Sequence, residues 1–243
     1  MLKRLFMSAL LGAGAPALAD ETDQAAYVEA NLVWIFYHEV AHALIHELSL
    51  PVLGREEDAA DTLAAVLIDY IWEPDSAIQI AWYQALGWYA SAQDSADGEL
   101  AHWGVHGHDM QRFYNHVCLW YGANPSERED FAETFELPEA RAEGCADEYA
   151  LAHRSWFTHL ESLSEAAPGD GLVFFEIEGD FGDAIIAEEV RTLNSLFEIP
   201  GSTSVAVEPC GEPNAFYVPG DSHIIICREY VDYLWQQAED LDL

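Results

Sequence analysis

Apolar residues recur at helical spacing over the first two thirds of the chain. This pattern predicts helices over 25–48, 56–71, 77–92, 107–121 and 137–164. The last third of the chain mixes helical spacing with the alternating spacing of strands. It predicts strands over 172–177, 205–207 and 224–226 and helices over 184–197 and 229–238. We therefore expect an α+β fold that is predominantly helical, with a small C-terminal β element.

The first predicted helix contains the motif His38-Glu39-Val40-Ala41-His42. Residues four apart share one face of a helix, so both imidazoles can reach one metal ion. Glu39 lies beside them, where it can meet a metal-bound water. This HExxH arrangement is typical of zinc hydrolases, and an apolar helix that ends before Pro51 is the right setting for it.

A catalytic zinc usually takes three protein ligands and keeps a fourth position open. His46 is too far from His38 to be the third, because at about 1.5 Å per residue the two rings start about 12 Å apart. The second predicted helix places Glu57 and Asp61 on an otherwise apolar face, where carboxylates need partners. We expect Glu57 to be the third ligand and Asp61 to accept a ligand histidine N–H. Glu56 is the alternative to Glu57.

The spacing Glu-x-x-x-Asp after HExxH resembles the gluzincin pattern of thermolysin-like peptidases, in which the Glu is the third ligand and the Asp orients a ligand His. That pattern carries over to Glu57 and Asp61. The HExxH motif followed by Gly-Arg-Glu-Glu-Asp-Ala-Ala-Asp at 54–61 is similar to a bacterial family of unknown function described as putative metallopeptidases. Further matching positions are 111–115, Cys118, Tyr121, Gly122, Cys145, Cys210, 214–217, Pro219 and Cys227. The resemblance implies a zincin-like active-site helix and one Zn²⁺ per chain.

Peptide hydrolysis also needs a donor to the oxyanion that forms on the scissile carbonyl. The family's pattern makes His106 the first choice, beside Glu39 as the second catalytic residue, and His108 the next. A polar loop without chemistry is the competing interpretation. Tyr217 is a further candidate donor. Arg112 could orient a substrate carboxylate or pair with an acid of this chain.

The run 214–226 looks like a hairpin found in some membrane-associated HExxH peptidases. There the hairpin precedes the zinc helix, whereas here it comes near the end of the chain. Our hypothesis is that it supplies an edge strand beside the cleft despite the changed order.

The N-terminus predicts a secretory signal peptide over 1–19, with basic Lys3 and Arg4, an apolar stretch, and Ala17-Leu18-Ala19 as the cleavage site. Residues 20–243 are then one domain in the periplasm or outside the cell. Four cysteines in an exported chain predict two disulfides, and pairing for the shortest loops gives Cys118–Cys145 and Cys210–Cys227. A second zinc site is the alternative, but no CxxC pair supports it.

The chain has 44 acidic and 9 basic residues and a formal net charge of −35. Such a surface repels nucleic acid and anionic membranes, so we expect neither as a partner. Beyond the predicted signal peptide, no apolar stretch reaches the roughly 18 residues that suggest membrane insertion. The sequence does not predict an oligomeric state.

The expected function is that of an exported zinc metallopeptidase acting on peptides or proteins through a metal-activated water. An exported, disulfide-braced module that keeps the HExxH site but only binds zinc or a partner is the alternative. A metal-free acidic scaffold is a third reading, and it leaves Glu57 and Asp61 without a reason to lie on an apolar face.

Overall fold

The computed structural model describes residues 3–4, 16–95, 102–164 and 169–243. Within them the elements follow one another as α1 (Pro16–Glu47), α2 (Glu56–Ile71), α3 (Pro74–Ser95), α4 (Asp109–Ala123), α5 (Glu129–Thr134), α6 (Glu139–Ser164), β1 (Leu172–Phe175), α7 (Phe181–Leu196), β2 (Thr203–Glu208), β3 (Ala215–Val218), β4 (His223–Cys227) and α8 (Arg228–Asp240). The fold is α+β and predominantly helical, with a small C-terminal sheet, as the sequence predicts.

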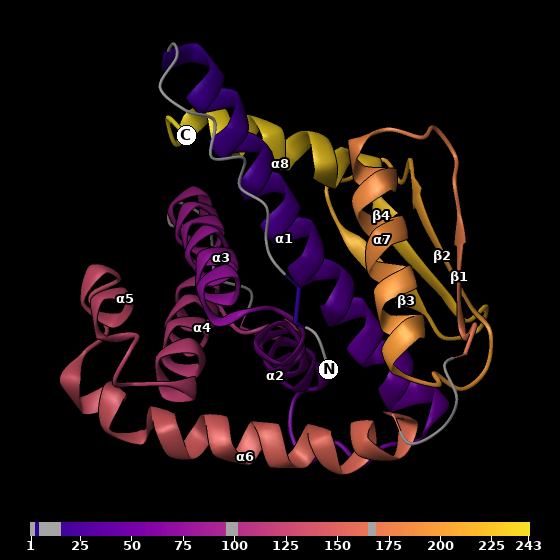
Figure 1. Ribbon diagram of the computed structural model, residues 1–243, viewed down its shortest axis with the longest axis horizontal. Coiled ribbons are helices and arrows are strands. Elements are labelled where there is room, and N and C mark those ends of the chain that lie inside the picture. The colour runs from indigo at the N-terminus through magenta and orange to yellow at the C-terminus, as the bar shows by residue number, and fades with distance from the viewer. Residues whose placement is uncertain (1–2, 5–15, 96–101, 165–168) are drawn as a thin grey trace.

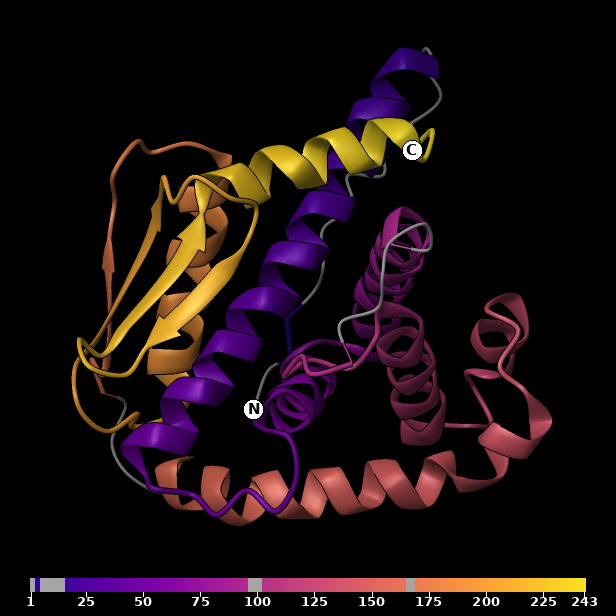
Figure 2. The ribbon, with the colours of Figure 1, turned by 180° about the vertical axis from the view of Figure 1, so that it is seen from behind.

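Helix α1 passes through the middle of the molecule, with α2 to α6 on one side and the sheet with α7 on the other (Figures 1 and 2). Most side chains between Ala26 and Ile45 are buried. A helix that is apolar nearly all round must be covered on every side, and the two halves of the fold provide that cover. The HExxH motif lies in the C-terminal third of this central helix.

The sheet has the strand order β1-β2-β4-β3. β1, β2 and β4 run parallel, whereas β3 pairs antiparallel with β4. Two parallel strands need a crossover between them, and α7 is the crossover from β1 to β2. β3 therefore lies at the edge of the sheet and contacts α1. The predicted hairpin at 214–226 is confirmed, and it brings an edge strand to the helix that carries HExxH.

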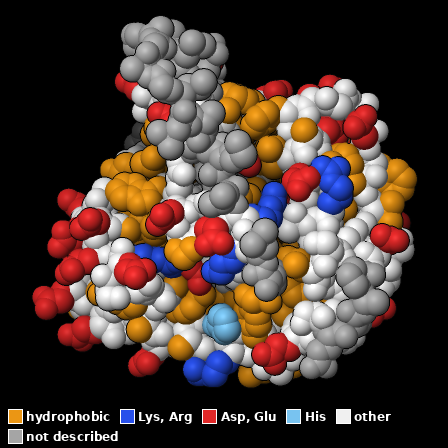
Figure 3. All heavy atoms as spheres, viewed as in Figure 1, with side chains coloured by type: hydrophobic (Ala, Val, Ile, Leu, Met, Phe, Trp, Pro, Cys, Tyr) orange, Lys and Arg blue, Asp and Glu red, His pale blue; other side chains and the backbone are white. Residues whose placement is uncertain are grey.

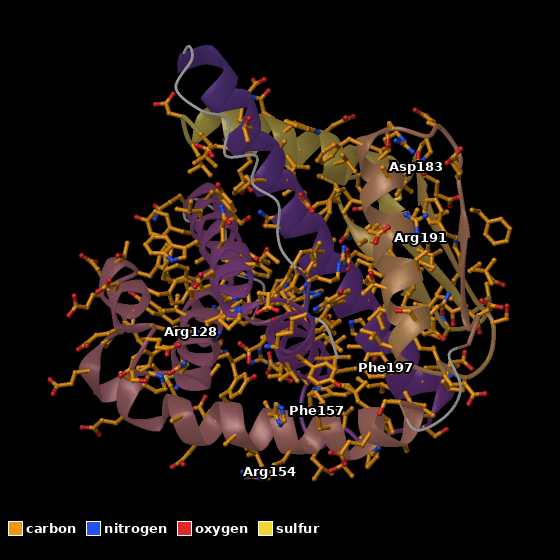
Figure 4. All side chains as sticks on the ribbon, in the orientation of Figure 1. Arg128, Arg154, Phe157, Asp183, Arg191 and Phe197 are labelled. Carbon is orange, nitrogen blue, oxygen red and sulfur yellow. A yellow bond between two sulfur atoms is a disulfide. The ribbon has the colours of Figure 1, made fainter. Side chains whose placement is uncertain are left out.

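Helix α2 lies between α1 and α6. On its α6 side, Tyr70 packs against Phe157, with ring centroids 4.7 Å apart (Figure 4). Asp69 forms an ion pair with Arg128, the residue before α5, at 2.6 Å (Figure 4). These contacts join α2 to α6 and to the segment before α5.

Both predicted disulfides are present. Cys118–Cys145 joins α4 to α6, and Cys210–Cys227 joins the loop after β2 to the end of β4. At the first of these, α4 and α6 approach so closely that a Cβ on Gly122 would lie 2.1 Å from the carbonyl oxygen of Cys145. Only glycine fits there, because no side-chain movement can relieve a clash with backbone.

Helix α2 begins and ends at the predicted residues, whereas α1 begins at Pro16 rather than at residue 25. The sequence did not predict α5, whose six residues are too few to show a helical period.

In the part of the chain that the structure describes, no helix combines the length and apolarity that crossing a membrane requires. Asp and Glu side chains gather at the edge formed by α5 and the start of α6 (left in Figure 3).

Residues 1–2 and 5–15 of the predicted signal peptide lie outside the described residues, and 16–19 belong to α1. Arg4 is described. Its Nη1 lies 2.6 Å from Oε1 of the buried Glu189, and its guanidinium stacks on Trp72 at 4.3 Å. Tyr37 donates to the other oxygen of Glu189 at 2.6 Å. The signal peptide stays a prediction, and its removal would take away the cation nearest to Glu189.

Candidate metal centre

Helices α1 and α2 place three predicted metal ligands against one another. His38 and His42 lie one turn apart on the face of α1 that meets α2, and Glu57 is in the first turn of α2. His38 Nε2 lies 3.2 Å from His42 Nε2 and 3.2 Å from Glu57 Oε2. The third side of this triangle, from His42 Nε2 to Glu57 Oε2, is 3.4 Å.

These three distances match one face of a tetrahedral zinc site. At zinc–ligand distances of about 2.0–2.2 Å, neighbouring ligand atoms of a tetrahedron lie about 3.3–3.6 Å apart. The side chains thus stand where a metal would need them, without any rearrangement of the helices.

The outer nitrogens of both histidines face carboxylates. His38 Nδ1 lies 2.9 Å from Asp61 Oδ1, and His42 Nδ1 lies 2.7 Å from Glu56 Oε1. A carboxylate only accepts, so each Nδ1 carries the proton and donates. If both rings are neutral, both Nε2 atoms then turn lone pairs towards the Glu57 oxygen, and these three atoms are all acceptors. Either a proton on one ring or a metal cation between the atoms removes that conflict.

Electrostatics at the triangle favour a positive charge. Burial lowers the pKa of His38, but hydrogen bonds to Asp61 and Glu57 outweigh it and raise the pKa to about 9. Burial raises the pKa of Glu57, yet hydrogen bonds from His106 and His38 hold it well below its ordinary value. The site therefore attracts either protons or a metal ion.

Glu39 lies beside the triangle on α1 and is 4% exposed. Burial raises its pKa, and the two histidines of the motif lower it. Its carboxylate accepts the backbone N–H of Tyr217 in the edge strand β3. The backbone of the edge strand therefore lies close to the predicted general base.

The triangle opens into a cleft of about 610 Å³. α1 and the start of α2 form one wall, β3 with Asn214 and Pro219 another, and Gly104, Val105 and His106 a third. The hypothesis of an edge strand beside the cleft is thus confirmed. The cleft thus lies between the three predicted ligands and the edge strand.

Comparison with known proteins shows which family the chain belongs to. Residues 9–160 match a family described as "Putative metallopeptidase". The chain belongs to this family. The match covers more than half of the chain, including HExxH, 54–61 and the first disulfide, and ends before β1. No curated protein and no solved structure matches.

In this metallopeptidase family member, the remaining predicted site residues divide into two groups. His106 is at the centre, with Nε2 2.9 Å from Glu57 Oε2. Arg112 reaches the site through Asp61, which it binds with two nitrogens at 2.7 and 2.9 Å. Pairing with an acid of this chain was one of the two options that the sequence left open for Arg112.

His108 and Tyr217 lie further out. His108 is the residue before α4, and its ring faces His102, with centroids 5.6 Å apart. The hydroxyl of Tyr217 lies 3.1 Å from Glu47 and 3.3 Å from His46, at the C-terminal end of α1. In this conformation the Tyr217 hydroxyl is engaged by other side chains, and the residue meets the site through its backbone.

Two features of the site were not predicted from the sequence. Glu56, considered there only as a rival ligand, accepts from His42 instead. Trp88 of α3 stacks on the guanidinium of Arg112 at 3.9 Å. The contact between Glu56 and His42 could have been predicted from the sequence Glu56-Glu57. Adjacent residues of a helix point about 100° apart, so two neighbouring glutamates can contact two different histidines. Nothing in the local sequence around Trp88 indicates that it stacks on Arg112.

Proposed function

We propose that the protein is an exported zinc-dependent peptidase whose ion is held by His38, His42 and Glu57. The carrying observation is the triangle of ligand atoms, with sides of 3.2, 3.2 and 3.4 Å, beside a buried glutamate in a cleft. Imidazole and carboxylate ligands suit zinc. The two disulfides support export, since such bonds persist in oxidising compartments.

A zinc ion held by these three residues would supply a Lewis acid to polarise a water and the scissile carbonyl. Glu39 accepts the proton of the water and then passes it to the leaving amine. Glu39 lines the cleft beside the ligands, and the backbone N–H of Tyr217 favours its ionised form. Asp61 and Glu56 hold the two histidines in the tautomer that presents Nε2.

A module that binds zinc without turnover is the second candidate function. The position of His106 beside Glu57 favours this module over a metal-free scaffold. The peptidase and the binding module differ in the role that they give to Glu39. Zinc binding alone does not require a carboxylate at position 39 beside the ligands, whereas hydrolysis requires a general base there.

The test is metal content and peptide hydrolysis in purified protein, for wild type, His38→Ala, Glu57→Ala and Glu39→Gln. We expect one zinc per chain in wild type and in Glu39→Gln, and much weaker binding in the other two. Hydrolysis of a peptide library should fall at least about a hundredfold in Glu39→Gln, which removes the general base. Glu139→Gln, an exposed glutamate at the start of α6, is the matched control. Equal hydrolysis by Glu39→Gln and wild type would exclude this mechanism.

A further inference from the structure

A third histidine lies at the predicted metal centre. His106 Nε2 is 2.9 Å from Glu57 Oε2, and the ligand atoms of His38, Glu57 and His106 lie within 4.8 Å of one another. The same Glu57 oxygen is 3.2 Å from His38 Nε2 and 3.4 Å from His42 Nε2. The ligand atoms of His38, Glu57 and His106 thus form one group, which His42 Nε2 joins through its contacts with His38 and Glu57.

We propose that His106 is a fourth protein ligand, so that the site at rest is a closed site of three histidines and one glutamate. This inference rests on the proposed metal site. A catalytic zinc needs an open position for water, and a site with four protein ligands has none. The His106 ring must therefore leave the ion before a water and a peptide carbonyl can reach it.

The surroundings of His106 allow that movement. Its side chain is 52% exposed, while those of the predicted ligands His38 and Glu57 are 3% and 17% exposed. Its neighbours Trp103 and Val105 are 82% and 66% exposed. Little apolar area is buried by this segment, so its displacement costs little, whereas the other ligands are fixed in packed helices.

A peptide substrate can supply the displacement. Gly104, Val105 and His106 form one wall of the cleft, facing β3. A chain that enters the cleft contacts the exposed side chains of this wall and competes with the imidazole for the ion. The wild-type protein is then a latent peptidase, whose ion is stable in the absence of substrate.

The experiment compares wild type, His106→Ala and His102→Ala, all in the full chain. His102 is an exposed histidine of the same segment and serves as the control. X-ray absorption of the zinc-loaded proteins counts imidazoles per ion, and a chelator competition gives zinc affinity. Acetohydroxamate, a small ligand that needs an open position, is the probe of access.

We expect three imidazoles per zinc in wild type and in His102→Ala, and two in His106→Ala. Outer-shell partners already change metal affinity by about 10–100-fold, so loss of His106 should weaken zinc at least about tenfold. Acetohydroxamate should bind at least about tenfold more tightly to zinc-loaded His106→Ala, because no ring has to be displaced.

Two results would overturn the inference, and they differ. If wild type and His106→Ala bind zinc with the same imidazole count and affinity, His106 is not a ligand, and the three-ligand peptidase stands. If wild type takes up no zinc even after supplementation, the metal site itself fails, and the fourth ligand fails with it.

Discussion

Replacing Arg112 with methionine should loosen the metal centre without touching a ligand. The guanidinium stacks on Trp88 and binds both oxygens of Asp61, and Asp61 in turn holds His38 Nδ1 at 2.9 Å. Methionine keeps an apolar stem against Trp88 but provides no donor. The Asp61 side chain then keeps only its hydrogen bond with His38 and is free to rotate, so the His38 ring is no longer held in one orientation.

The magnitude follows from the burial of this pair. Asp61 and Arg112 have side chains that are 15% and 11% exposed, so the pair is largely desolvated. Breaking a buried pair by removing one partner costs about 3–5 kcal/mol, and we expect the lower end because Asp61 retains His38. Zinc affinity should fall about 10–100-fold, the usual effect of losing an outer-shell partner.

Two assays separate these effects. Urea unfolding of the metal-free protein gives the stability change, and competition with a chromophoric chelator gives zinc affinity. Arg191→Met is the control, because Arg191 is 67% exposed on α7 and, among the described residues, its ion pair is with the exposed Glu188 (Figure 4). We expect at most about 1 kcal/mol there and no change in zinc affinity. Wild-type zinc affinity in a folded Arg112→Met protein would refute the reasoning.

Three further predictions concern the scaffold. Gly122→Ala should destabilise the protein by roughly 1–3 kcal/mol in urea unfolding, since the added Cβ meets the backbone of Cys145; unchanged stability would mean that α4 and α6 can separate at no cost. Replacing Cys210 and Cys227 together by serine should cost about 3 kcal/mol, from the 17-residue separation that the bond closes. Under reducing conditions wild type and variant should be equally stable, because Cys118–Cys145 is then open in both. Burial lowers the pKa of His116 from 6.5 to about 4, so the unfolded chain binds a proton that the folded one rejects. The free energy of unfolding should drop by roughly 2 kcal/mol from pH 7 to pH 5 through this group, and urea unfolding of His116→Phe should lack that part of the slope.

The sequence predicted those parts of the site that depend on local geometry. HExxH and the apolar face of the next helix are properties of single elements, and a helix fixes which residues share a face. His38 and His42, and the carboxylates at 57 and 61, could therefore be assigned to one point before any contact was known. The disulfides were also within reach, because short loops close most easily.

The parts that the sequence did not predict depend on contacts between distant elements. Trp88 and Arg112 belong to different helices, and their stacking follows only from how α3 and α4 pack. The N-terminus is a similar case. Composition near Arg4 is that of a signal peptide, but no local pattern reveals that a buried glutamate 185 residues later lies opposite it.

The contact between Arg4 and Glu189 has a consequence for the predicted signal peptide. A carboxylate that is 1% exposed needs a cation or several donors. With Arg4 present, Glu189 has the guanidinium and the Tyr37 hydroxyl. If the predicted cleavage after Ala19 occurs, only the hydroxyl of this pair remains, and protonation of Glu189 then becomes the cheaper state. The processed protein must therefore either carry a neutral Glu189 or admit another cation to the space beside Trp72.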